Sequence, residues 1–152
     1  MCTSFMGELM TATHNFGVAP IRATTTVDTF KAALYLTSAT INAATTAYTV
    51  TGEVSGTNYS AGGVTVTTAT PPTATNSSAT AGVAFFTPSA SITYTTVTLS
   101  TAFDTVLLYN STQSDKAVSV HTFGSQTITA GTFTLTMPTN NTSTALLRLA
   151  TT

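Results

Sequence analysis

Apolar and polar residues alternate with a period of two along most of the chain from residue 21 onward. In the segment 29–37, for example, Phe30, Leu34 and Leu36 fall on one parity and Lys31 on the other. Side chains of a strand point to opposite faces in turn, so this alternation predicts strands with one buried face. We expect strands over 29–37, 47–51, 64–69, 82–86, 91–99, 103–109, 116–123, 127–137 and 145–150.

Two of these strands carry signs of irregularity. Ile92 and Tyr94 share one parity whereas Val97 and Leu99 share the other. A change of parity of this kind indicates a β-bulge, here near 95–96. The segment 127–137 is expected to bend at 130–131, where a glycine follows an alanine.

The connections between the strands are marked by glycine, proline and small polar residues. Pro71 and Pro72 cannot donate hydrogen bonds to a sheet, so the low-complexity segment 70–80 is expected to be a loop. Gly124 and Ser125 are expected to form a turn between two strands. Roughly eight to ten short strands with regularly spaced turns are typical of a β-sandwich or jelly roll. The predicted fold is therefore an all-β, jelly-roll-like β-sandwich.

The first segment of the chain has a different pattern. Its apolar residues recur at three- and four-residue spacing, namely Phe5, Met6, Leu9 and Met10. This spacing predicts a short helix over 4–14, which Gly17 and Pro20 would end. We therefore divide the chain into an N-terminal helical arm, 1–20, and a β-sandwich domain, 21–152. The helix either plugs one end of the sandwich or docks on a partner subunit, in which case its four apolar residues would bind the partner.

Composition narrows the classes of partner. The 152 residues carry a net charge of -1, and only 6% of them are charged, against about 25% in an ordinary soluble domain. Four scattered cations cannot form a basic patch, so binding to nucleic acid is not expected. No apolar run approaches the roughly 20 residues that span a membrane, and no signal peptide is visible. The 42% of hydrophobic residues argues against disorder.

Candidate catalytic and metal-binding residues are few. The chain has one cysteine, Cys2, and two histidines, His14 and His121, without the spacing of a metal site. A site at a histidine would need a carboxylate such as Glu8 or Asp104 brought near by folding, and we expect both histidines to lie on the surface instead. No nucleophile elbow is present. We therefore expect no enzymatic activity, no metal and no cofactor.

Three further features have structural explanations. Glu53 lies in a glycine-bounded turn, where we expect its carboxylate to accept hydrogen bonds from backbone N–H groups. Arg148 interrupts an apolar strand and is expected to pair with an acid or to reach solvent. Thr-x-Thr recurs without a fixed period, for example at 93–95 and 132–134, and is expected to form the polar face of ordinary strands.

The chain resembles a family of small structural proteins of tailed bacteriophages. The segments that carry the resemblance extend over nearly the full length, whereas 70–104 departs from it. They are Cys2-Thr-Ser-Phe5, Thr29-Phe-Lys-Ala-Ala-Leu-Tyr35, Thr46-Ala-Tyr-Thr49, Gly52-Glu-Val-Ser-Gly56, Tyr59-Ser-Ala-Gly-Gly63, Leu108-Tyr-Asn110, Lys116-Ala-Val118 and Phe133-Thr-Leu-Thr-Met-Pro138.

This resemblance implies a virion protein with no active site. Similar short β proteins are capsid decoration, or cement, proteins with jelly-roll folds that bind the outer surface of the major capsid shell and stabilise it. The implied partners are the major capsid protein and further copies of the chain, as a homodimer or homotrimer. The protein would be made in the host cytoplasm and located on the capsid surface of the virion.

One alternative places the chain in the tail or a fibre, in contact with host surface glycans. An exposed aromatic cluster beside polar side chains would support that function, and the candidates are Tyr48, Tyr59 and Tyr94. An enzyme is a distant third possibility, because it would need acids or histidines that converge in a pocket.

Overall fold

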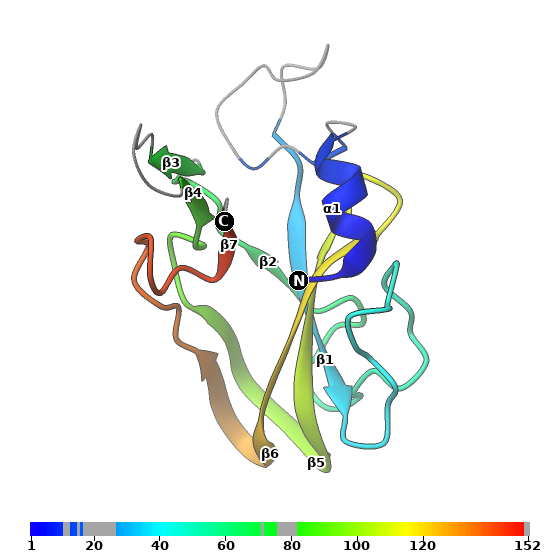
Figure 1. Cartoon of the computed structure of the whole chain (residues 1–152). Coiled ribbons are helices and arrows are strands. Elements are labelled where there is room, and N and C mark those ends of the chain that lie inside the picture. The colour runs from blue at the N-terminus through cyan, green and yellow to red at the C-terminus, as the bar shows by residue number, and fades with distance from the viewer. Residues whose placement is uncertain (11–12, 15, 17–26, 71, 76–81, 151–152) are drawn as a thin grey trace.

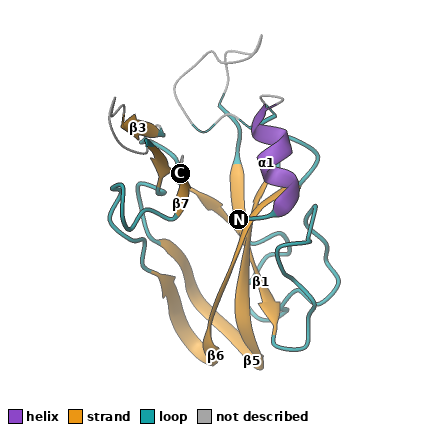
Figure 2. Cartoon of the chain, in the orientation of Figure 1, coloured by secondary structure: helices purple, strands orange, loops and turns teal. Residues whose placement is uncertain are grey.

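A computed structural model of the chain describes residues 1–10, 13–14, 16, 27–70, 72–75 and 82–150. Its strands form two antiparallel sheets (Figures 1 and 2), which confirms the all-β class. The elements in chain order are α1 (Thr3–Met10), β1 (Phe30–Leu36), β2 (Val64–Val66), β3 (Thr73–Thr75), β4 (Val83–Phe86), β5 (Ile92–Asn110), β6 (Lys116–Leu135) and β7 (Leu147–Ala150).

Two sheets of different size share these strands. The larger has the order β2-β1-β5-β6, and the smaller has the order β3-β4-β7. In the larger sheet β1 pairs with β5 from Phe30 opposite Asn110 to Leu36 opposite Phe103. In the smaller sheet the C-terminal β7 pairs with β4, with Leu147 opposite Phe86. The last strand of the chain therefore lies beside a strand from its middle.

The long hairpin of β5 and β6 folds back on itself. Phe123 and Phe133 are ten positions apart on β6, yet their ring centroids lie 5.3 Å apart. Ten residues of a straight strand would span about 34 Å, so β6 must bend sharply between these two residues. Figure 1 shows the bend at the bottom of the molecule, with one part of each strand on either side of it. Phe103 of β5 lies inside this bend, 5.2 Å from the ring of Phe133.

The bend changes how the sequence pattern maps onto strands. The expected pairs of strands in 91–109 and in 116–137 are each one continuous strand, so the turn expected at Gly124 is wrong. The expected bulge is confirmed, because the register shifts between Tyr94 and Val97 and Thr96 has a φ of 54°. The bend expected at 130–131 also has a backbone basis, since Ala130 has a φ of 48°. Such left-handed residues are uncommon outside turns and bulges.

The structure differs from the predicted strands in four other segments. The strand expected at 47–51 is reduced to an isolated bridge between Ala47 and Lys116. The expected loop 70–80 contains the short strand β3. The strands expected at 64–69 and 145–150 are shortened to β2 and β7. Of the strands in these segments, β2, β3 and β7 each lie at the edge of a sheet and pair on one side only.

The core joins the first residues of the chain to both sheets. The ring of Phe16 stacks on Phe30 of β1 with centroids 4.4 Å apart, and it contacts Phe86 of β4 and Phe5 of α1 at 4.9 and 5.9 Å. Cys2 and Phe5 belong to the same buried cluster. The described part of the segment 1–20 thus packs against residues of both sheets. The expected boundary near residue 20 lies outside the described residues.

Candidate interaction surfaces

A buried polar network fastens the N-terminal segment to the end of the larger sheet. His14, only 6% exposed, lies after α1 with its Nε2 2.7 Å from Oε2 of Glu8. Lys116, the first residue of β6, donates from Nζ to Oε1 of the same carboxylate at 2.8 Å. The expectation that His14 lies on the surface is wrong, because folding brings the Glu8 carboxylate to it. Burial raises the pKa of Glu8, but the hydrogen bonds from Lys116 and His14 outweigh this and lower the pKa overall.

The second ring nitrogen of His14 fixes the protonation state. Asn110 is fully buried, and its Oδ1 accepts from the backbone N–H groups of Thr112 and Gln113. Its Nδ2 therefore faces Oδ2 of Asp28 at 2.8 Å and Nδ1 of His14 at 3.1 Å. Because Nδ2 can only donate, Nδ1 of His14 must accept, and the proton resides on Nε2 toward Glu8. The imidazole is neutral in this arrangement, and burial lowers its pKa.

Across the described ranges, no three His, Cys, Asp or Glu side chains gather so that they can hold a metal ion. The second histidine, His121, is half-buried on β6 with its Nε2 2.9 Å from Oγ of Ser119. His14 and His121 therefore have separate hydrogen-bond partners.

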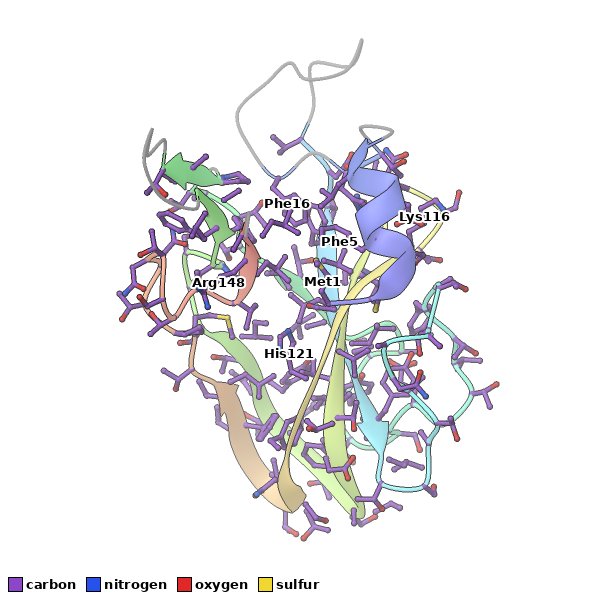
Figure 3. The ribbon with its side chains drawn as sticks, in the orientation of Figure 1. Met1, Phe5, Phe16, Lys116, His121 and Arg148 are labelled. Atoms are coloured by element: carbon purple, nitrogen blue, oxygen red, sulfur yellow. The ribbon has the colours of Figure 1, made fainter. Side chains whose placement is uncertain are left out.

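The residues predicted to bind a partner through α1 face the chain's own interior where they are described. Phe5 is 2% exposed within the core. Leu9 is half-buried and lines a cavity of about 200 Å³ between α1 and the strands β4 and β7. Figure 3 shows Phe5 and Phe16 on one side of this space and Arg148 of β7 on the other. The side chains of Met6 and Met10 lie outside the described part of the structure.

The tyrosines proposed for glycan contact converge instead on a buried carboxylate. Tyr48 and Tyr59 are half-buried, and their hydroxyls donate to Oε2 and Oε1 of Glu53 at 2.6 and 2.7 Å. The backbone N–H of Gly62 donates to the same Oε1 at 2.8 Å, which confirms the expected role of Glu53. Tyr94 is 2% exposed and donates to the carbonyl of Ala32. The hydroxyls of these tyrosines are thus used inside the chain, so the three do not form the exposed aromatic cluster that would have supported the tail or fibre alternative.

The open edge of β6 is the most extensive unpaired backbone among the described strands. The start of this edge is covered, since Ala117 donates to the carbonyl of Thr46 and Cys2 donates to that of Val118. From Ser119 to Leu135 no described residue outside β5 forms a backbone ladder with β6. An open edge of this length is a template for pairing with another chain.

Charge does not protect this edge. Between Lys116 and Arg148 the chain contains no Asp, Glu, Lys or Arg, and its first proline in that interval is Pro138. Natural edge strands are usually guarded by lysine, proline, bulges or a covering segment. On β6 the described guards are the bend itself and the left-handed Ala130. We therefore define the open edge as residues 119–135 of β6.

The opposite edge of the same hairpin is covered. Thr98 of β5 donates its backbone N–H to the carbonyl of Thr57 at 3.1 Å, and Nδ2 of Asn58 donates to the carbonyl of Thr96 at 2.8 Å. The two segments touch so closely that a Cβ at Gly56 would lie 2.0 Å from the carbonyl oxygen of Thr98. Among the described residues, contacts thus cover the β5 edge at Thr96 and Thr98, and none pairs with the β6 edge beyond Val118.

Threonines form the outer face of this hairpin. Thr95, Thr129, Thr132 and Thr134 are exposed, and the hydroxyls of Thr93 and Thr134 lie 3.5 Å apart across the two strands. The inner face holds Tyr94 and Phe133, whose rings are in contact. The Thr-x-Thr segments at 93–95 and 132–134 therefore form the polar face of strands, as expected.

Comparison of the chain with protein-family models, with curated proteins and with solved structures found no match. In the described part of the chain, no helix is long and apolar enough to cross a membrane. The interpretation of function therefore depends on the chemistry of the surfaces described above.

The sequence contained a signal for only some of these features. The absence of charge after Lys116 was visible, and so was the glycine-bounded turn of Glu53. The network around Asn110 was not, because it joins residues 82 and 96 positions apart. The open edge also required the structure, since pairing order cannot be read from the alternation of a single strand.

Proposed function

We propose that the chain is a non-enzymatic structural protein of a tailed-phage virion, a capsid decoration protein that binds the outer surface of the major capsid shell and stabilises it. The observation that carries this proposal is the open, uncharged edge of β6 at 119–135. A strand edge recognises another chain through its backbone, by β-augmentation, and needs no catalytic group. The same proposal includes two features of the fold. The two sheets have a jelly-roll-like connection, and the N-terminal helix closes one end.

Low charge supports a role in a dense symmetric array. Each charge on a decoration protein is repeated at every copy, so like charges would face one another across short distances. With 6% charged residues the chain largely avoids this repulsion. The ionic contacts of Glu8, one of its five acids, are internal.

The internal networks support the proposal in a second way. A decoration protein must present a fixed shape, since binding energy spent on ordering the protein is lost from the contact. The carboxylates of Glu8 and Glu53 each join segments that are separated in the sequence. The surface that remains for contact is therefore carried on a preformed scaffold.

The proposal is tested with particles of the producing phage that lack this gene product. The full recombinant chain should co-sediment with such particles, raise the temperature at which they release DNA, and appear on the outer capsid surface in electron microscopy. A matched chain with Thr129→Lys and Thr132→Lys, at the open edge, should bind more weakly. A chain with Thr95→Lys on the same face should bind normally. Failure of the full chain to bind, or its presence only in the tail, would refute the capsid assignment.

A further inference from the structure

We infer that the open edge of β6 pairs with the same edge of a second copy of the chain, antiparallel and about a two-fold axis, along residues 131–135. This inference rests on the proposed function for its role on the particle, and it names the partner of the same edge. The pairing would extend the hairpin of one copy into a four-stranded ribbon shared by two.

The segment is already shaped for such a contact. It lies in one arm of the bent hairpin, namely the part beyond the bend in which β6 pairs with residues 92–99 of β5. Tyr94 and Phe133 pack on the inner side of this arm, and Phe103 packs against Phe133 from the other side of the bend. Because these aromatic contacts hold the arm in place, its β6 edge is already ordered before a second copy pairs with it. Little conformational entropy would then be lost on pairing.

Charge favours a second copy over a different partner. A two-fold contact brings each side chain close to its equivalent, so any charge would meet its own sign. The whole of β6 after Lys116 lacks Asp, Glu, Lys and Arg, and a symmetric contact therefore involves no such repulsion. A different protein would usually be selected through complementary charges, which this edge does not offer.

The alternation of side chains fits one register. Thr132 and Thr134 are exposed, whereas Phe133 between them is directed toward the core. A two-fold axis at Phe133 places Thr132 of each copy opposite Thr134 of the other. Cross-strand threonine pairs stabilise antiparallel sheets, and the two Phe133 rings would lie on the inner face, where they continue the aromatic cluster.

The contact is expected to be weak in dilute solution and effective on a particle. Five paired residues extend over about 17 Å, and one strand pair buries less surface than a standard interface. Copies held side by side on a capsid would have a high local concentration, which turns a weak pairing into a stable one. Analytical ultracentrifugation of the full chain should therefore show a monomer that dimerises as its concentration rises.

Cysteine cross-linking tests the register. Opposite residues of an antiparallel pair have Cα atoms about 4.5 to 5.5 Å apart, within disulfide range, whereas diagonal neighbours are about 7 to 8 Å apart. The only native cysteine, Cys2, is fully buried. Thr132→Cys mixed with Thr134→Cys should form a disulfide-linked dimer under mild oxidation. Either variant alone should give much less, and Thr95→Cys, on the same face but on β5, should give none.

The outcomes separate this inference from the proposed function. A chain that stays monomeric at millimolar concentration and forms no mixed cross-link overturns the inference, even if it binds particles. Equal cross-linking of Thr95→Cys would indicate stacking of threonine faces and would also overturn it. Strong self-cross-linking of either β6 variant alone would overturn the register centred on Phe133. A dimer with the mixed cross-link that binds no particle supports the inference and refutes the capsid function.

Discussion

The Nδ1 atom of His14 accepts a hydrogen bond from Nδ2 of Asn110, 96 positions along the chain, at 3.1 Å. The amide cannot be reversed without loss of its bonds from the backbone of Thr112 and Gln113. A proton added to Nδ1 would therefore face a second donor. The anchoring of the N-terminal segment to the end of β5 thus depends on a neutral imidazole.

The free energy of unfolding should fall as the pH falls from about 7 to 5. Burial lowers the pKa of His14 below its ordinary value of 6.5. Between these two pKa values His14 is protonated in the unfolded chain but not in the folded chain. This contribution to stability is present above pH 6.5 and is lost toward the lower folded pKa. The pKa of Glu8, lowered from 4.5, extends the loss to more acidic pH.

Urea unfolding at a series of pH values measures this loss. His14→Gln should lower stability at pH 7 and make the decline between pH 7 and 5 shallower. His121→Gln is the control. Burial lowers the pKa of His121 as well, so this variant should remove only the part of the pH-dependent loss of stability that His121 causes. A decline that His14→Gln leaves unchanged would show that the neutral imidazole is not required.

Glu53→Gln should destabilise the fold although the two side chains have nearly the same shape. The carboxylate accepts from Tyr48, Tyr59 and the N–H of Gly62. The Nε2 group of the glutamine can only donate, so it would face at least one of these donors without forming a hydrogen bond. A buried unsatisfied group costs about 1 to 3 kcal/mol. Asp104→Asn, at a half-buried acid on β5, should cost less. Equal costs in denaturant unfolding would contradict the importance of the Glu53 network.

Gly63→Ala should prevent folding or weaken it severely. Gly63 has a φ of 71°, and a Cβ there would lie 1.7 Å from the carbonyl oxygen of Ala32 in the neighbouring strand. Gly124→Ala is the matched control, because nothing lies within 4 Å of a Cβ at that position. The expected result is a cooperative thermal transition near that of the unaltered chain for Gly124→Ala only. A normal transition for Gly63→Ala would show that the two strands can move apart.

Phe5→Ala should cost about 3 to 5 kcal/mol of stability, as for a large side chain removed from a core. Phe5 is 2% exposed and its ring contacts both His14 and Phe16. Val50→Ala, at a side chain 68% exposed, should have little effect. If Phe5→Ala left the denaturation midpoint unchanged, α1 would act as a detachable arm, and its role in closing the core would be wrong.

The sequence predicted the class of the fold well and its connectivity less well. The apolar parity of the expected strands predicts eight core residues. Four of them are buried, namely Phe30, Leu34, Leu107 and Val118, and four are half-buried against the core, namely Leu36, Val120, Phe133 and Leu135. Parity along a strand reports which side faces the core, and it also located the bulge near Thr96. It does not report whether two apolar runs belong to one strand, because a bent strand and a turn interrupt the alternation alike.

The candidate surfaces were harder to predict, for a physical reason. The apolar spacing of Phe5 and Leu9 indicated a helix with a buried side but not the surface against which it is buried. That surface includes Phe16, which contacts Phe5 and is itself packed on Phe30 and Phe86 of the two sheets. Likewise, the absence of Asp, Glu, Lys and Arg between Lys116 and Arg148 can be read from the sequence, but the pairing order of the strands decides which edge stays open.

A side-chain-resolution cryo-EM map of the intact particle that carries this chain tests the central claim most directly. We expect density for the β5–β6 hairpin on the outer surface of the capsid shell, with the edge 131–135 of one copy paired with that of a second. Density for this chain only in the tail, or no density in the virion, would contradict it.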